Sequence, residues 1–178
     1  MLLQIPCFVF SQTPDLGAAA PFALFTAAGA FNGDVGSSVV GDIGTNIGAF
    51  TPPGTIVGQI HVADLVSAQA AADVSTAYGY LSTLTCGGVL GVTLGNGQLV
   101  TPGIYCTGAA STLNGALTLD GQGDPNALFI FQIDGAFATN VNSTVTLING
   151  ASLCNVYWQV NGEVDLGENS TFYGTIVN

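Results

Sequence analysis

Short apolar runs separated by turns rich in glycine, asparagine and aspartate dominate the second half of the chain. The runs recur at roughly 20-residue spacing, which is typical of stacked structural repeats. Most are apolar almost throughout, as in parallel strands covered on both sides, whereas the strands of a sandwich alternate. We therefore predict a stack of parallel β-coils, with a β-sandwich as the alternative. The predicted strands are Val92–Leu94, Gly103–Tyr105, Ala116–Leu119, Leu128–Ile133, Val145–Ile148, Asn155–Val160, Glu163–Leu166 and Ser170–Val177.

The first half of the chain predicts strands at 22–29, 38–46 and 57–61, followed by one helix. Between residues 62 and 84, alanines replace glycines and apolar residues recur every three or four positions, as on one face of an amphipathic helix. These residues are Val66, Ala70, Val74, Ala77, Leu81 and Leu84. Gly87 and Gly88 give a stop signal. We predict that this helix packs on the β-coils through Val66, Val74 and Leu81.

The composition indicates one packed domain and restricts its partners. The chain has 178 residues, 48% of them hydrophobic, and 25 glycines, which favours a packed fold over disorder. It has no lysine or arginine, eleven acidic residues and a net charge of −11. Without cationic groups it cannot neutralise phosphates, so nucleic-acid binding and binding to anionic membranes are excluded. The negative charge can also serve solubility alone.

The two ends of the sequence suggest secretion and a longer solenoid. Residues 2–10 are apolar and precede Ser11-Gln12, like a signal peptide that lacks its basic start, and they are too short to span a bilayer. We interpret residues 1–12 as a clipped signal remnant of a secreted or cell-surface protein, with an ordered strand as the alternative. The chain ends within the strand pattern of 175–178, whereas solenoids need capped ends. We therefore expect the domain of residues 13–178 to continue into further coils, with a further domain C-terminal to it as another possibility.

Four cysteines suggest one disulfide. Cys7 would be removed with the signal remnant, whereas Cys86 and Cys106 flank a loop-rich stretch. A bridge that closes a loop of this length contributes roughly 3 kcal/mol and is compatible with export. We expect Cys154, which sits in an apolar strand, to be a free and buried thiol. The cysteine spacings match no zinc site.

The residues with catalytic or metal-binding chemistry form no recognisable active site. His61 is the only histidine, and we expect it to be a solvated or capping residue before the helix. Glu163, Asp165 and Glu168 could suggest a glycosidase pair, but Glu163 and Asp165 lie on one strand, whereas such pairs flank a cleft from separate elements. The loop 120–124 resembles a calcium loop without the later bidentate glutamate, so an inter-coil turn is the preferred interpretation. We expect no catalytic residue, metal or cofactor.

Several segments, in their order and spacing, resemble the microbial ice-binding proteins. They are Phe22-Ala23-Leu24, Val40–Gly44, the helix through Ala77-Tyr78, Leu99–Tyr105, Leu117–Ile133, Cys154–Val160 and Gly174–Ile176. The resemblance spans about residues 15–178. It implies an irregular right-handed β-solenoid with one long helix alongside, and a non-catalytic protein that adsorbs to ice. The family's usual chain continues into further coils with a Gly-Arg-containing strand and a Thr-rich segment, which this sequence lacks.

Ice recognition requires a flat, rigid face with short hydroxyl or methyl groups at regular spacing and few charges. Stacked strands provide such a face with a repeat of about 4.8 Å. Threonine is also a good strand former, which is the alternative explanation for each candidate. The candidates are Thr45, Thr55, Ser143, Thr144, Thr146, Ser170, Thr171 and Thr175.

Two other functions remain open at this point. One is a structural or adhesive cell-surface module with the same fold and no ice affinity. The other is a polysaccharide-acting β-helix enzyme, which is disfavoured because the chain lacks the Arg or Lys that usually holds acidic sugars. Ice binding and adhesion differ in whether the outward Thr and Ser residues form one flat face free of Asp and Glu.

Overall fold

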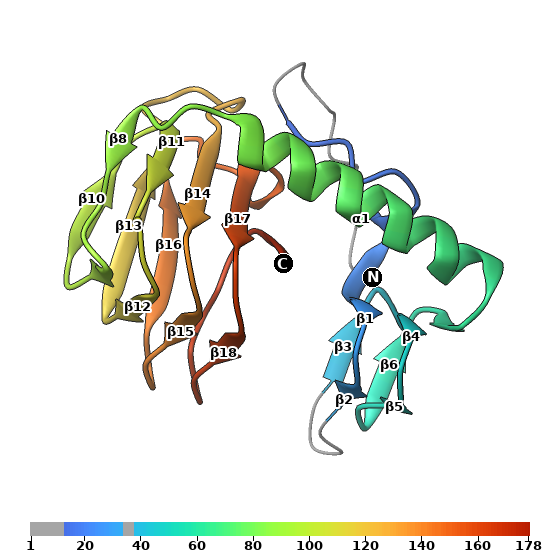
Figure 1. The fold of residues 1–178 in the computed structure, drawn as a ribbon. Coiled ribbons are helices and arrows are strands. Elements are labelled where there is room, and N and C mark those ends of the chain that lie inside the picture. Colours follow the sequence, from blue (N-terminus) through green and yellow to red (C-terminus); the bar gives the residue numbers. More distant parts are fainter. Residues whose placement is uncertain (1–12, 34–37) are drawn as a thin grey trace. The chain divides into compact units, whose positions relative to one another are not determined.

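The computed structural model describes residues 13–33 and 38–178, so the predicted signal remnant at 1–12 and Cys7 lie outside the described residues. The chain forms two compact units, Pro14–Gly79 and Tyr80–Asn178. The described strands pair in parallel, and one α-helix, α1 (Leu65–Thr83), accompanies them (Figure 1). No helix in these residues is both long and apolar enough to cross a membrane.

The unit formed by residues 80–178 is a three-sided β-solenoid, because the chain visits three parallel sheets in turn. The first sheet has the order β19-β17-β14-β11-β8, the second β18-β15-β12-β9 and the third β10-β13-β16. The strands are β8 (Gly88–Val89), β9 (Thr93–Gly95), β10 (Gln98–Val100), β11 (Gly103–Cys106), β12 (Ser111–Asn114), β13 (Ala116–Asp120), β14 (Phe129–Ile133), β15 (Phe137–Thr139), β16 (Thr144–Ile148), β17 (Val156–Val160), β18 (Val164–Leu166) and β19 (Thr175–Val177). The predicted stack of parallel β-coils is confirmed.

The unit formed by residues 14–79 has the same arrangement with fewer coils. Its sheets have the orders β1-β4-β7, β2-β5 and β3-β6, and every pair is parallel. The strands are β1 (Phe22–Ala28), β2 (Phe31–Asn32), β3 (Ser38–Val40), β4 (Asp42–Ile47), β5 (Phe50–Thr51), β6 (Thr55–Val57) and β7 (Ile60–Val62). A short 3-10 helix, η1 (Gly17–Ala19), precedes them, and the Asp73 carboxylate of α1 accepts a hydrogen bond from the backbone N–H of Ala18.

An aromatic ladder fills the interior of the solenoid of residues 80–178. Tyr105, Phe131 and Trp158 lie at successive positions of the first sheet in exact register pairs, and their rings stack. The ring centroids of Phe131 and Trp158 are 4.0 Å apart, and Trp158 is fully buried. Its indole N–H donates to the backbone carbonyl of Tyr173. The largest side chain of the core is therefore both packed and hydrogen-bonded, as buried tryptophans usually are.

The helix begins at a polar N-cap. The backbone N–H of Ser67 donates to Asp64 Oδ1 (2.7 Å) while the Ser67 hydroxyl accepts from the Asp64 N–H (2.9 Å), which is a reciprocal capping arrangement. His61 Nδ1 lies 2.8 Å from Asp64 Oδ2. These hydrogen bonds lower the pKa of the Asp64 carboxyl, with the Ser67 N–H as the largest cause and His61 next. His61 lies in β7 before the helix, where it contacts the capping carboxylate of Asp64 rather than capping a helix N–H itself.

The buried stripe of α1 consists mainly of small residues. Ala70, Ala77 and Leu81 are buried as predicted, and Ser67 joins them. Val74 and Leu84 are half-buried. Val66 is 41% exposed, so the prediction that it packs inward was wrong. Its position is one residue before Ser67, and the capping contact of Ser67 with Asp64 fixes which residues of the first turn face inward.

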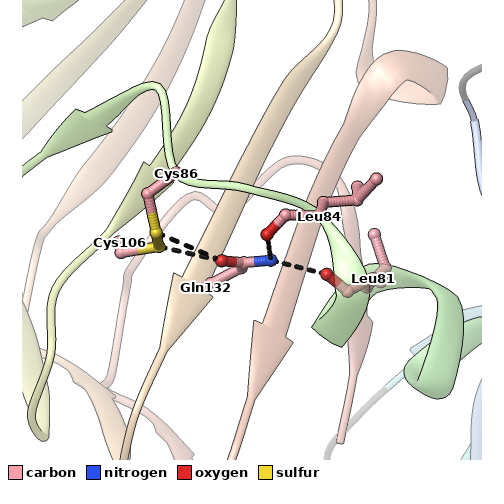
Figure 2. The surroundings of a disulfide bond; sticks show 5 residues. All are labelled: Leu81, Leu84, Cys86, Cys106 and Gln132. Atoms are coloured by element: carbon pink, nitrogen blue, oxygen red, sulfur yellow. Dashed lines mark hydrogen bonds between the residues drawn. A yellow bond between two sulfur atoms is a disulfide. The ribbon is translucent and has the colours of Figure 1, made fainter.

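Gln132 joins the end of the helix to the first sheet of the solenoid. Its side-chain Nε2 donates to the carbonyls of Leu81 (2.5 Å) and Leu84 (3.0 Å), which are helix-end acceptors (Figure 2). Its Oε1 lies 2.8 Å from the sulfur of Cys106. Cys86 and Cys106 are joined, with their Cα atoms 5.8 Å apart, so the predicted disulfide is confirmed. This bridge and Gln132 together hold the chain where it leaves the helix.

The prediction for Cys154 was wrong. Cys154 is disulfide-bonded, and the described part of the chain has no free cysteine. It lies in the 3-10 helix η2 (Leu153–Asn155) ahead of β17, and it is only half-buried there. The apolar run that follows suggested an inert thiol inside a strand, but the strand starts two residues later.

Replacing Leu81 by aspartate tests how the helix end is held. Leu81 is fully buried, and its backbone carbonyl accepts from Gln132. A carboxylate at this position would be buried without a partner, so we expect a loss of several kcal/mol in the free energy of unfolding. The exposed position Ser82, changed to aspartate, is the matched control. Equal melting temperatures for the two variants would contradict the assignment.

The capping carboxylate makes a testable contribution to the pH dependence of stability. The folded pKa of Asp64 lies below its usual value of 3.8, so the unfolded chain holds the proton more tightly. The contribution is therefore present above pH 3.8 and is lost as the pH falls through the folded pKa. Asp64→Asn keeps an N-cap side chain but cannot titrate. We expect stability to fall less steeply with acidification in this variant, measured by urea unfolding at several pH values; identical slopes for variant and wild type would exclude the effect.

Candidate functional site

The third sheet of the solenoid of residues 80–178 has one buried side and one exposed side. Leu117, Leu119 and Val145 point into the core. Because successive strand residues point to opposite sides, the residues between them face outward. We call this outward surface the threonine face and define it as Leu99, Ala116, Thr118, Thr144, Thr146 and Thr171.

Strand register arranges the threonine face in two rows. Leu99 pairs with Thr118, and Thr118 pairs with Thr146. Ala116 pairs with Thr144, which bridges to Thr171 in the next coil. Neighbours in a row are separated by the inter-strand spacing of about 4.8 Å, and the two rows by about 6.6 Å along each strand. The four threonines therefore lie on a grid with one fixed spacing along each row and another between the rows.

One residue per coil, in the left-handed backbone conformation, precedes each segment of the third sheet. Gly115, Asn142 and Asn169 have φ values of 64°, 61° and 55°, and each lies at the corner between the second and third sheets. Glycine and asparagine adopt this conformation most readily, so the corner turns at the same place in successive coils. The N–H of Thr144 donates to the carbonyl of Gly115, which continues the ladder through the corner. Thr144 and Thr171 therefore start their segments at equivalent positions.

The hydroxyl groups of the threonine face point away from the rest of the described chain. In the described part of the chain, those of Thr118, Thr144, Thr146 and Thr171 make no hydrogen bond to another protein group. By contrast, the buried Ser143 hydroxyl donates to the carbonyl of Leu113 (3.0 Å). The face therefore presents hydroxyl groups that are open to solvent or to a ligand.

Acidic side chains lie around the threonine face rather than within its two rows. Asp120 ends β13 on the same side, where its Oδ1 accepts from the Gln122 N–H and the Asn149 amide in the corner turn. On the second sheet, by comparison, Asp165 pairs with Ala138 and is exposed. The outward side of the first sheet includes Gln132, which is bonded to the helix end. Among the three sheets of this unit, the third therefore offers the outward surface with the most threonine hydroxyl groups, and its two rows contain no acidic residue.

A hollow of about 500 Å³ lies at one end of the threonine face. It is lined by Thr144, Val145, Thr146, Leu147, Leu153, Thr171 and Tyr173. Its polar groups are hydroxyls, and no ionisable carboxylate lines it. The hollow is therefore a neutral extension of the same surface.

The structure brings three of the eight sequence candidates together. Thr144, Thr146 and Thr171 lie on the threonine face. Ser143 and Ser170 precede them at the corner, and their hydroxyls donate to backbone carbonyls. The remaining candidates are Thr45, buried in β4; Thr55, exposed in β6 of the other unit; and Thr175, half-buried in β19 of the first sheet.

Thr118 was missed by the sequence analysis. It pairs with Thr146 in the centre of the sheet. The repeated pattern apolar-Thr-Leu, at 117–119 and again at 145–147, could have identified it. The sequence alone does not reveal that these two segments lie side by side.

The acidic segments considered for chemistry serve as turns and solvated strands. Glu163, Asp165 and Glu168 are exposed just before, within and after β18, respectively. Within 120–124, the Asp124 carboxylate accepts from the N–H of Asn126, as Asp120 does from Gln122. Such bonds from an aspartate to a backbone N–H two residues ahead are typical of turns. Among the described residues, no three His, Cys, Asp or Glu side chains converge as metal ligands would.

Comparison with known proteins gives consistent results. The model of the family described as Ice-binding-like matches residues 24–178. An ice-binding protein of Nostoc sp. (strain HG1) is 42% identical over 71% of this chain, which spans 46% of that protein. Ice-binding protein 1 of Shewanella frigidimarina (strain NCIMB 400) is 33% identical over 92% of the chain, which spans 22% of it. The chain thus spans less than half of the length of either relative.

A solved structure gives the same result. The crystal structure of an ice-binding protein from the Antarctic ascomycete Antarctomyces psychrotrophicus has a TM-score of 0.86 and 36% identity, and the match covers 93% of this chain and 82% of that one. Because the family match includes nearly all of the described residues and the fold agrees, this chain belongs to the Ice-binding-like family.

Proposed function

We propose that the protein binds ice through the threonine face, and that it does so without catalysis. The observation that supports this most directly is the ordered set of Thr118, Thr144, Thr146 and Thr171, whose hydroxyls make no hydrogen bond to any other group of residues 13–33 and 38–178. Family membership supports the same proposal, since the relatives described above are named ice-binding proteins.

Ice binding by the threonine face would be the sum of many weak contacts. Each threonine offers one hydroxyl and one methyl group, so it can hydrogen-bond to water and also exclude it. The contribution of any one such group is small, because a hydrogen bond to the protein replaces one to water. Many groups held at fixed spacing on a rigid sheet add their contributions without further ordering entropy, which is the advantage of a preorganised surface. Adsorbed protein would then restrain the growth or recrystallisation of ice.

The position of the charges also favours this face. A carboxylate attracts and orients water strongly, so placing it against a solid water lattice costs desolvation free energy. The two rows of the threonine face contain no such group, whereas Asp165 lies on the second sheet. The absence of lysine and arginine removes the corresponding cationic groups from the whole chain.

We further propose that the protein is secreted or displayed at the cell surface. Ice is met outside the cell, and the Cys86–Cys106 disulfide is compatible with an oxidising compartment. The side chains of the threonine face are neutral and short, so the proposed contact requires no partner other than ice.

Bulky substitutions on the threonine face test the proposal. Thr146→Tyr and Thr171→Tyr should abolish thermal hysteresis and recrystallisation inhibition, because one large side chain lifts the flat surface from the ice. Both residues are exposed, so folding should be retained, as judged by circular dichroism and melting temperature. Thr76→Tyr on α1, where the native hydroxyl bonds to the Ala72 carbonyl, is the control and should keep activity.

A substitution on the second sheet tests which of the two exposed sheets contacts ice. Ala138 pairs with Thr112 at its centre, and Ala138→Tyr should leave activity unchanged. Loss in Ala138→Tyr together with full activity in Thr146→Tyr would move the contact to the second sheet and contradict the proposed face. A folded wild-type chain without either activity would support the alternative of a structural or adhesive module.

A further inference from the structure

We infer that Leu99 sets the boundary of the ice-contacting surface at the β10 end of the threonine face. This inference rests on the proposed function and adds a residue that determines how large the contact is. It concerns the row that contains Leu99, Thr118 and Thr146, in which one position departs from the pattern of the other two.

Leu99 occupies a position of the face rather than of the core. It pairs directly with Thr118, and its side chain is 56% exposed. Its neighbour Val100 is only 4% exposed and belongs to the core cluster, so the strand alternates here as it does in β13 and β16. The exposure of Leu99 is therefore a consequence of its register and not of a frayed strand.

The chemistry of leucine differs from that of the threonines in two ways. It has no hydroxyl, so it cannot take part in the hydrogen-bonded contact that Thr118 and Thr146 offer. It is also longer, because its branch lies one carbon further from the backbone. A side chain that projects beyond its neighbours prevents the lattice from approaching them along this edge, so the usable row is limited to two coils.

Leu99→Thr should extend the row to three coils. Threonine is β-branched and suits an exposed strand position, so the variant should fold as the wild type does. We expect thermal hysteresis at equal protein concentration to rise above the wild-type value. Val89→Thr is a matched control, since Val89 is 82% exposed in β8 of the first sheet. It removes a similar apolar surface elsewhere and should leave the activity unchanged.

A variant in which Leu99 and Thr118 are exchanged tests whether activity depends on the order of the residues in the row or only on their composition. Leu99→Thr combined with Thr118→Leu has the same amino-acid content as the wild type but places leucine in the middle of the row. We expect its activity to fall below the wild-type value, although its hydroxyl count is the same. Melting temperatures of all variants would show that each is folded.

The outcomes distinguish this inference from the proposed function. Active wild type with a gain in Leu99→Thr and no gain in Val89→Thr supports the inference. Active wild type with unchanged or reduced activity in Leu99→Thr overturns it while leaving the proposed ice contact intact, and shows that the leucine methyl groups are neutral or contribute. An equal gain in Val89→Thr also overturns it, because the effect would then come from general surface polarity. Inactive wild type removes the proposed function and this inference together.

Discussion

The in-register parallel pairing of successive coils determines both the core and the outer faces of the solenoid. Parallel ladders place equivalent residues of neighbouring coils directly opposite each other, so every inward position extends the core and every outward position extends a face. The ladder that joins β13 to β16 shows both effects, since Leu117 meets Val145 inside and Thr118 meets Thr146 outside. A shift of one residue would exchange these two sets. The regular outer surface is thus a direct consequence of a regular interior.

Rigidity comes from features at either side of the first sheet. Inside, the stacked rings of Phe131 and Trp158 fill the solenoid with large side chains that have few rotamers. Outside, Gln132 ties the helix end to β14, next to the disulfide (Figure 2). A surface that recognises a solid must keep its shape, because any entropy lost on adsorption opposes binding. These contacts leave the third sheet uncovered while fixing the sheet beside it.

The sequence predicted the architecture better than the site. Long apolar runs such as 128–133 identified the buried strands, and the three-to-four spacing of Ala70, Ala77 and Leu81 identified the helix. The short strands β8, β10, β12 and β15 were missed, because two to four residues give no periodicity and their pairing is with distant segments. Thr118 was missed although its strand was predicted, because the sequence does not reveal that this strand lies beside the strand of Thr146. Ser143 was included because the direction of its hydroxyl depends on the corner that precedes it. The inward turn of Ser143 follows from the left-handed Asn142, which strand propensity does not reveal.

Ice-affinity partitioning of the wild-type chain measures directly whether the protein adsorbs to ice. Ice is grown slowly from a dilute solution of the chain mixed with an acidic, similarly sized protein that has no ice affinity, and both are quantified in the solid and the remaining liquid. We expect this chain to be enriched in the ice fraction while the second protein is excluded. Equal exclusion of both, with the chain shown to be folded, would contradict this expectation.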